Sequence, residues 1–190
     1  MKTKILFSLI IFALFACKNN NKNPITNDAV VEEPEAVVTE VRKVVVDLSA
    51  KSGSNASGTA EFVQDGDTVT LTVSISGLNE GEHAIHIHEK ADCSAVDGTS
   101  TGGHWNPTAQ PHGKWGDSNG YHKGDIGNLN TDGNGEATLT FKTDEWCIGC
   151  GNPQMDILGK GLIVHEGADD FTTQPTGNAG GRISCGGIIE

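Results

Sequence analysis

From Val41 to the last residue, glycine-rich and polar turns divide the chain into short apolar runs, and no stretch keeps a helical period for three turns. Within the runs, apolar and polar residues alternate, which is typical of strands that bury one face. The expected strands, about eight in number, are VVVDLSA, GTAEFVQ, TVTLTVSISG, HAIHIHE, DIGNLNTD, EATLTFKT, KGLIVHE and RISCGGII. The pattern predicts an all-β fold, an eight-stranded antiparallel Greek-key β-barrel or sandwich of immunoglobulin-like architecture.

Two connections between these strands are too long for a simple meander. Residues 91–123 and 166–181 are polar and rich in glycine. Loops of this length in a compact domain are usually functional or disordered. We expect functional loops, because the first contains His104, His112 and His122.

The first 40 residues differ in composition from the rest. Residues 1–17 combine two lysines with the apolar run ILFSLIIFALFA and end at Cys17, which is typical of an export signal and is short for a membrane span. The ending LFAC resembles the lipobox of bacterial lipoproteins and predicts a lipid anchor on Cys17; an ordinary cleaved signal is the alternative. Residues 18–40 are expected to be a flexible acidic and Asn-rich tether, and residues 41–190 the folded domain. The mature chain is therefore expected in the cell envelope, in the periplasm or anchored to a membrane.

The chain is acidic, with 13 basic and 25 acidic residues. Loss of Lys2 and Lys4 with the signal leaves 11 basic residues, and the net charge changes from −12 to −14. This charge argues against nucleic acid as a partner. It is also an unfavourable background for an anionic substrate.

Lipid on Cys17 would leave four cysteines, an even number in an oxidising compartment, which allows two disulfides. Cys147 and Cys150 form the motif CIGC in a loop rich in Gly, without the following helix of a thioredoxin-like site. We expect a local disulfide between them. Free thiols and an accessory metal site are the alternatives.

The histidines have the spacing of metal ligands. His86 and His88 are two apart on a predicted strand, so both side chains leave one face, whereas His83 has the opposite parity. His165 ends a later strand and can complete a group with the first two. The next loop adds a donor set that suits Zn²⁺, namely His104, His112, His122 and Asp125. Exposed strand histidines and a solvated histidine-rich loop are the alternatives.

Six histidines and one aspartate are one ligand short of two independent four-coordinate sites. An imidazole that binds one cation through each ring nitrogen would supply the missing ligand.

Together these segments closely resemble the copper/zinc superoxide dismutase family, in an exported, lipoprotein-like bacterial form. The matching stretches are GEHAIHIHE, GGHWNP, HGKWGDSNGYHKGDIGN, LIVHEGADD and GNAGGRISCGGII, in the family's order over about Val41 to Glu190. The resemblance implies dismutation of superoxide to dioxygen and hydrogen peroxide by copper, bridged through a histidine to a structural zinc, and protection of the cell envelope. The copper ligands it implies are His86, His88, His104 and His165. The zinc ligands it implies are His104, His112, His122 and Asp125, with His104 as the bridge.

Further roles follow from the same resemblance. Cys93 and Cys185 match the family's disulfide. Asp169 matches a carboxylate that links one copper histidine to one zinc histidine and fixes their ring orientation. Arg182 matches an arginine that attracts the anion, so Arg182 and His104 are the expected catalytic residues. His83 is expected to be a hydrogen-bonded structural histidine.

The loop expected to attract the substrate differs from that of better-known members of the family. Residues 166–181 contain no lysine, whereas animal enzymes have a longer loop with basic residues there. Attraction of superoxide is expected to depend on the metals and Arg182, with Lys90, Lys123 and Lys160 as further candidates. A noncatalytic module that stores or delivers copper is the rival function, against which the zinc ligands and Arg182 argue. A homodimer is compatible with the sequence, which does not fix the oligomeric state.

Overall fold

The computed structural model describes residues 40–190. The predicted signal, Cys17 and the predicted tether up to residue 39 lie outside the described residues. The elements are β1 (Arg42–Ala50), β2 (Ser57–Asp65), β3 (Thr68–Ser76), β4 (Glu82–His88), the 3₁₀ helix η1 (Thr99–Thr101), β5 (Asp125–Asn130), β6 (Ala137–Thr143), β7 (Gly161–His165) and β8 (Arg182–Gly187). All eight predicted strands are present. Residues 40–190 contain no helix long and apolar enough to cross a bilayer.

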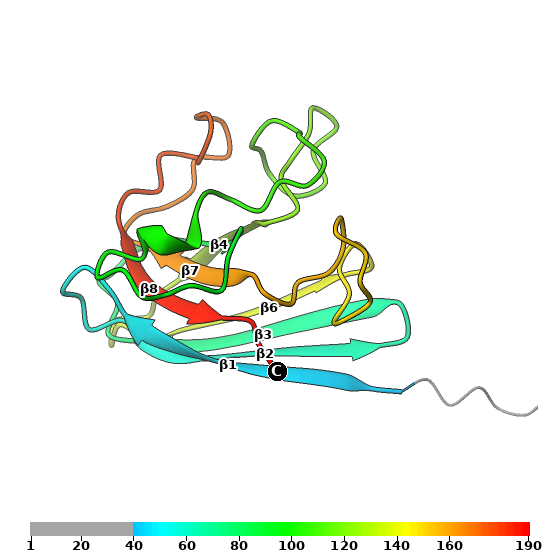
Figure 1. Ribbon diagram of the computed structural model, residues 1–190. Helices are drawn as coiled ribbons and strands as arrows, with labels where there is room; N and C mark the ends of the chain where they lie inside the picture. Colours follow the sequence, from blue (N-terminus) through cyan, green and yellow to red (C-terminus); the bar gives the residue numbers. More distant parts are fainter. Residues whose placement is uncertain (1–39) are drawn as a thin grey trace, which may run out of the picture. The chain divides into compact units, whose positions relative to one another are not determined.

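The strands form one antiparallel sheet in the order β5-β4-β7-β8-β1-β2-β3-β6. The two outer strands of this order, β5 and β6, contact each other, so the sheet curls into a nearly closed barrel. Neighbours such as β4 and β7 are not consecutive in sequence, as in a Greek-key arrangement. In Figure 1, β4, β7 and β8 lie above β1, β2, β3 and β6. The predicted all-β Greek-key fold is confirmed.

Alternation along the strands separates core from solvent. In β1, Val44, Val46 and Leu48 are buried, whereas their neighbours are exposed. Strand β4 is different, because every residue from His83 to His88 is buried. Ile85 and Ile87 belong to the hydrophobic core, while His86 and His88, which alternate with them, are buried as well. A strand covered on both faces can therefore carry polar side chains away from water.

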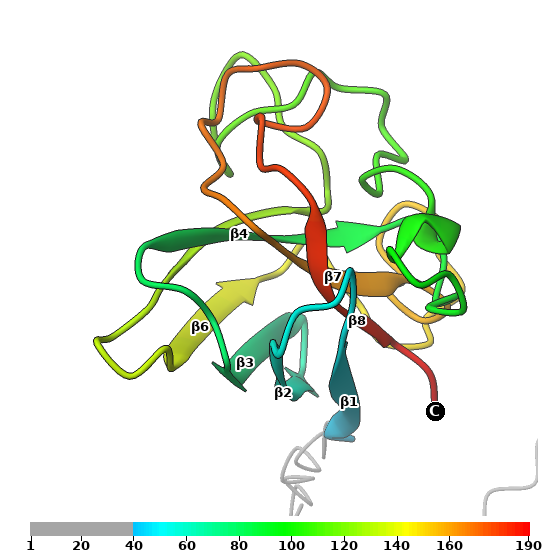
Figure 2. The same ribbon diagram turned by 90° about the vertical axis from the view of Figure 1, so that its left-hand side faces the viewer.

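The two long predicted loops lie on the same side of the barrel, above β4 and β7 (Figures 1 and 2). The first loop, residues 89–124, contains η1, and the second comprises residues 166–181. A third connection, residues 144–160, contains the CIGC motif that was expected in a loop. It is ordered by its apolar residues, because Ile148 and Ile157 are buried in the barrel core.

Candidate metal centre

Strands β4 and β7 supply one group of histidines. His86 and His88 lie on β4, where His86 pairs with Ile163 of β7, and His165 ends β7. A backbone bridge between His88 and His104 brings the first long loop to the same place. One ligand atom of each of four buried residues lies within 4.8 Å of the others, namely His86, His88, His104 and His165.

Two β-bulges lie beside this group. In β5 the pairing with β4 shifts at His86, which then faces Asp125. In β8 the pairing with β7 shifts at His165, which then faces Arg182. Bulges of this kind re-aim side chains. They set Asp125 and Arg182 opposite two histidines of the first group.

A second group surrounds the carboxylate of Asp125. Its Oδ1 lies 2.9 Å from His104 Nδ1 and 3.3 Å from His122 Nδ1, and its Oδ2 lies 3.0 Å from His112 Nδ1. Backbone N–H groups of Gly113 and His122 also donate to Oδ2. The ligand atoms of this group again lie within 4.8 Å of one another. His104 belongs to both groups, as the shared-ligand prediction requires.

The hydrogen bonds of the rings fix which nitrogen carries a lone pair. His88 Nδ1 donates to the Gly102 carbonyl at 3.0 Å, and His165 Nδ1 donates to the Gly180 carbonyl at 3.3 Å. The Nε2 atoms of His86 and His112 donate to Asp169. The opposite nitrogen of each of these rings is therefore free to bind a cation.

Several buried nitrogens within residues 40–190 have no hydrogen-bond partner. They are His86 Nδ1, His104 Nε2, His112 Nδ1 and His122 Nδ1. Buried polar atoms are nearly always satisfied, so this concentration of orphaned nitrogens needs an explanation. Nε2 of His88 also lies 3.4 Å from Nε2 of His165. Lone pairs that converge in this way fit two bound cations, one in each group, and imidazole suits copper as well as zinc.

Burial keeps three of the rings in the form that binds metals, whereas at His112 the effect of burial is outweighed by Asp125 and Asp169, which raise the pKa to about 9. Burial lowers the pKa of His104 to about 4 against the opposing effect of Asp125, and it lowers that of His165 to about 3. Burial, with the nearby His104, also holds the pKa of His88 well below its usual value. These rings are neutral near pH 7, which is the form that binds metals. Burial opposes the ionised form of Asp125, but the close rings of His104, His112 and His122 hold its pKa well below the usual range.

Asp169 links the two groups. Its Oδ2 accepts from His86 Nε2 at 2.8 Å, and its Oδ1 accepts from His112 Nε2 at 2.9 Å. The Asn128 side chain binds both the N–H and the carbonyl of Asp169, which fixes its backbone. Gly177 is required beside this carboxylate, because its φ is 66° and a Cβ there would overlap Asp169 Oδ1.

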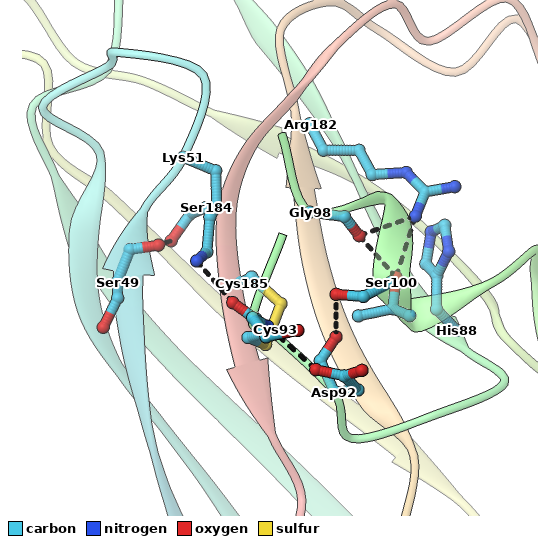
Figure 3. The surroundings of a disulfide bond; sticks show 12 residues. Ser49, Lys51, His88, Asp92, Cys93, Gly98, Ser100, Arg182, Ser184 and Cys185 are labelled. Atoms are coloured by element: carbon cyan, nitrogen blue, oxygen red, sulfur yellow. Dashed lines mark hydrogen bonds between the residues drawn. A yellow bond between two sulfur atoms is a disulfide. The ribbon is translucent and has the colours of Figure 1, made fainter. Parts of the chain in front are cut away.

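Arg182 lies at the edge of the first group, close to His88 (Figure 3). Nη1 donates to the Gly98 carbonyl and to Thr101 Oγ1, and Nη2 donates to the Gly102 carbonyl, each at 2.8 Å. A disulfide between Cys93 and Cys185 ties the start of the same loop to β8, with the Cα atoms 5.9 Å apart. The loop and the strand that carries Arg182 are therefore held together covalently.

The remaining predicted residues lie away from the two groups. His83 is buried on the other side of β4, with Nδ1 2.8 Å from the His165 carbonyl and Nε2 3.0 Å from the Asn79 carbonyl. Cys147 and Cys150 form a disulfide in the third loop. Nearby Asp156 completes a possible donor trio, but its carboxylate already accepts backbone N–H bonds from Gly149, Gly151 and Leu158.

Several contributors were missed in the sequence. The carbonyls of Gly102 and Gly180 orient rings, but a backbone carbonyl leaves no residue-type signal. Gln174 binds both the N–H and the carbonyl of His112, which couples the two long loops. Its only signal was its place in a loop already expected to be functional.

Lys123, a predicted candidate for attracting the substrate, pairs with Glu145, so its charge is neutralised locally.

Comparison with known proteins agrees with this geometry. The family described as copper/zinc superoxide dismutase (SODC) matches residues 56–188. The chain belongs to the copper/zinc superoxide dismutase family. Its relatives include an extracellular superoxide dismutase [Cu-Zn] of Caenorhabditis elegans, which is 34% identical over 99% of this chain and 78% of the relative. Another, from Drosophila melanogaster, bears the same description and is 39% identical over 71% of this chain and 76% of the relative.

Solved structures are also similar to this chain. A SOD-like protein from Bacillus subtilis superposes with a TM-score of 0.68 at 33% identity, covering 76% of this chain and 97% of the other. The clock protein EA4 superposes with a TM-score of 0.67 at 35% identity, covering 77% of this chain and 94% of the other. The chain is thus an enzyme of the superoxide dismutase class, and its cofactors are copper and zinc. The two histidine groups could hold these metals.

Proposed function

We propose that the two groups form one bimetallic centre for superoxide dismutation, in which His104, the residue common to both groups, would be a ligand of copper and of zinc. The observation that carries this proposal is the sharing of His104 by two buried four-residue groups that contain orphaned nitrogens. The proposed copper ligands are His86, His88, His104 and His165. The proposed zinc ligands are His104, His112, His122 and Asp125.

Copper supplies a one-electron couple, which lets one superoxide be oxidised to dioxygen while a second, with two protons, is reduced to hydrogen peroxide; zinc has no redox chemistry and supplies charge and geometry. The protein's part is orientation and proton handling. The carbonyls of Gly102 and Gly180 and the carboxylate of Asp169 hold the rings. His104 Nε2 is the nitrogen that can hold a proton beside the reacting anion whenever it is not bound to metal.

Arg182 is proposed to attract and orient the substrate. Its permanent charge and planar fork suit a small anion. Three hydrogen bonds hold its guanidinium at the edge of the copper group. Because residues 166–181 contain no lysine and Lys123 is paired with Glu145, local attraction rests on Arg182 and the metals, with Lys90 and Lys160 as the remaining candidates.

We further propose that residues 41–190 form the catalytic domain of an exported lipoprotein that protects the cell envelope. The basic and apolar start, the LFAC sequence and the following tether support this proposal. The disulfides are typical of an oxidising compartment. The extracellular relatives agree with export. The proposed anchor is Cys17.

The function is tested on a chain that lacks residues 1–17, loaded with copper and zinc. We expect one copper and one zinc per chain and removal of superoxide in stopped-flow assays. His104→Ala should retain the remaining ligands of each group but lose activity. Two bound metals without activity in the unaltered chain would favour a copper storage module instead.

A further inference from the structure

A buried hydroxyl lies behind the proposed anion-binding arginine. Thr101 ends η1 and is fully buried. Its Oγ1 donates to the Gly98 carbonyl at 2.9 Å and accepts from Arg182 Nη1 at 2.8 Å. Nη1 also donates to the Gly98 carbonyl. Because the only hydroxyl proton goes to Gly98, the oxygen presents a lone pair to the guanidinium.

These contacts determine which edge of the guanidinium remains available. Arginine has five N–H bonds. Gly98 and Thr101 use both bonds of Nη1, and Gly102 uses one bond of Nη2. The bond at Nε and the second bond of Nη2 are left for an anion. The Gly102 carbonyl also accepts from His88 Nδ1, so the same loop orients the arginine and a proposed copper ligand.

We propose that Thr101 is a positioning residue for superoxide binding: its hydroxyl holds Arg182 so that the Nε and Nη2 edge is ready for the anion. The inference rests on the proposed role of Arg182. An arginine fixed before the anion arrives loses less side-chain freedom on binding, which favours binding. Figure 3 shows Arg182 beside Gly98 and His88, with the disulfide between Cys93 and Cys185 in the same view.

The hydroxyl and the methyl group of Thr101 can be tested separately. Its Cγ2 lies against the backbone of Gly161, close to the point where a Cβ at Gly161 would be. Thr101→Val keeps this packing and removes the hydroxyl, whereas Thr101→Ser keeps the hydroxyl and removes the methyl. Thr99→Val is a matched control, because Thr99 lies in the same 3₁₀ helix but is exposed and donates to Asp97.

The experiment uses the copper- and zinc-loaded mature protein, with metal content and the Cu(II) EPR spectrum checked for each variant. Two readouts are compared: kcat/KM for superoxide, and the dissociation constant of azide, a small anion that ligates Cu(II), from its absorption change. Thr101→Val should weaken azide binding and lower kcat/KM about three- to tenfold, as expected for the loss of a charge-assisted hydrogen bond. Thr101→Ser and Thr99→Val should stay close to the unaltered protein.

Other results would overturn the inference in distinguishable ways. Unchanged values for Thr101→Val, together with weakened values for Arg182→Ala, would refute the role of Thr101 and leave that of Arg182. Equal losses in Thr101→Val and Thr101→Ser would assign the effect to packing and refute the hydroxyl's role. Unchanged values for Arg182→Ala would refute the proposed role of Arg182 and the inference with it.

Discussion

The Cys93–Cys185 disulfide should contribute far more to stability than the Cys147–Cys150 disulfide. The first joins residues separated by 92 positions and the second joins residues separated by 3. In the chain-entropy treatment, the first stabilises the folded state by about 4.6 kcal/mol and the second by about 1.6 kcal/mol. The local disulfide also lies in a loop held by other contacts, such as the bond from Arg42 to the Ile148 carbonyl.

The assay is urea unfolding of the metal-free protein, which separates this effect from metal binding. Cys93→Ala/Cys185→Ala should lose roughly 3–4.6 kcal/mol of unfolding free energy, and Cys147→Ala/Cys150→Ala should lose at most about 2 kcal/mol. For a domain of this size the larger loss corresponds to a fall in Tm of roughly 10–15 °C. Equal losses in the two double variants would refute the reasoning from loop closure.

Three further predictions concern the centre, the substrate and the anchor. Asp169→Asn should lower metal affinity about 10- to 100-fold in chelator competition, because His86 and His112 donate to different oxygens of the carboxylate and the amide replaces one oxygen by an NH2 donor. The exposed Asp170→Asn should not lower the affinity, and equal affinities in the two variants would contradict this. Raising the ionic strength from about 10 to 150 mM should lower kcat/KM, because salt screens local attraction by Arg182 and the metals; faster turnover would show that the net charge of −14 dominates. Cys17→Ser in the full chain should move the protein from the membrane to the soluble fraction and abolish lipid labelling; an unchanged distribution would disprove the anchor.

The strands could be predicted from sequence because each buries one face and therefore alternates. All eight predicted runs became strands, with ends close to those expected. In strand β4, the alternation predicts part of the site as well as the fold. Its two parities separate core isoleucines from the histidines at 86 and 88, and the structure brings these histidines to His165 and His104.

Other parts of the site leave little trace in the sequence. The bulges that set Asp125 opposite His86 and Arg182 opposite His165 depend on strand register, which residue types alone do not determine. The carbonyls of Gly102 and Gly180 act through the backbone. The hydroxyl of Thr101 acts through a contact across 81 positions, which no local pattern signals.

The central claim is that one imidazole joins two metals in a shared centre. It is tested most directly by crystals of the loaded mature protein, with anomalous diffraction collected at the copper and zinc absorption edges. We expect one copper peak bounded by His86, His88 and His165 and one zinc peak beside Asp125, with the His104 ring between them. A single metal site, or two peaks not joined by His104, would contradict it.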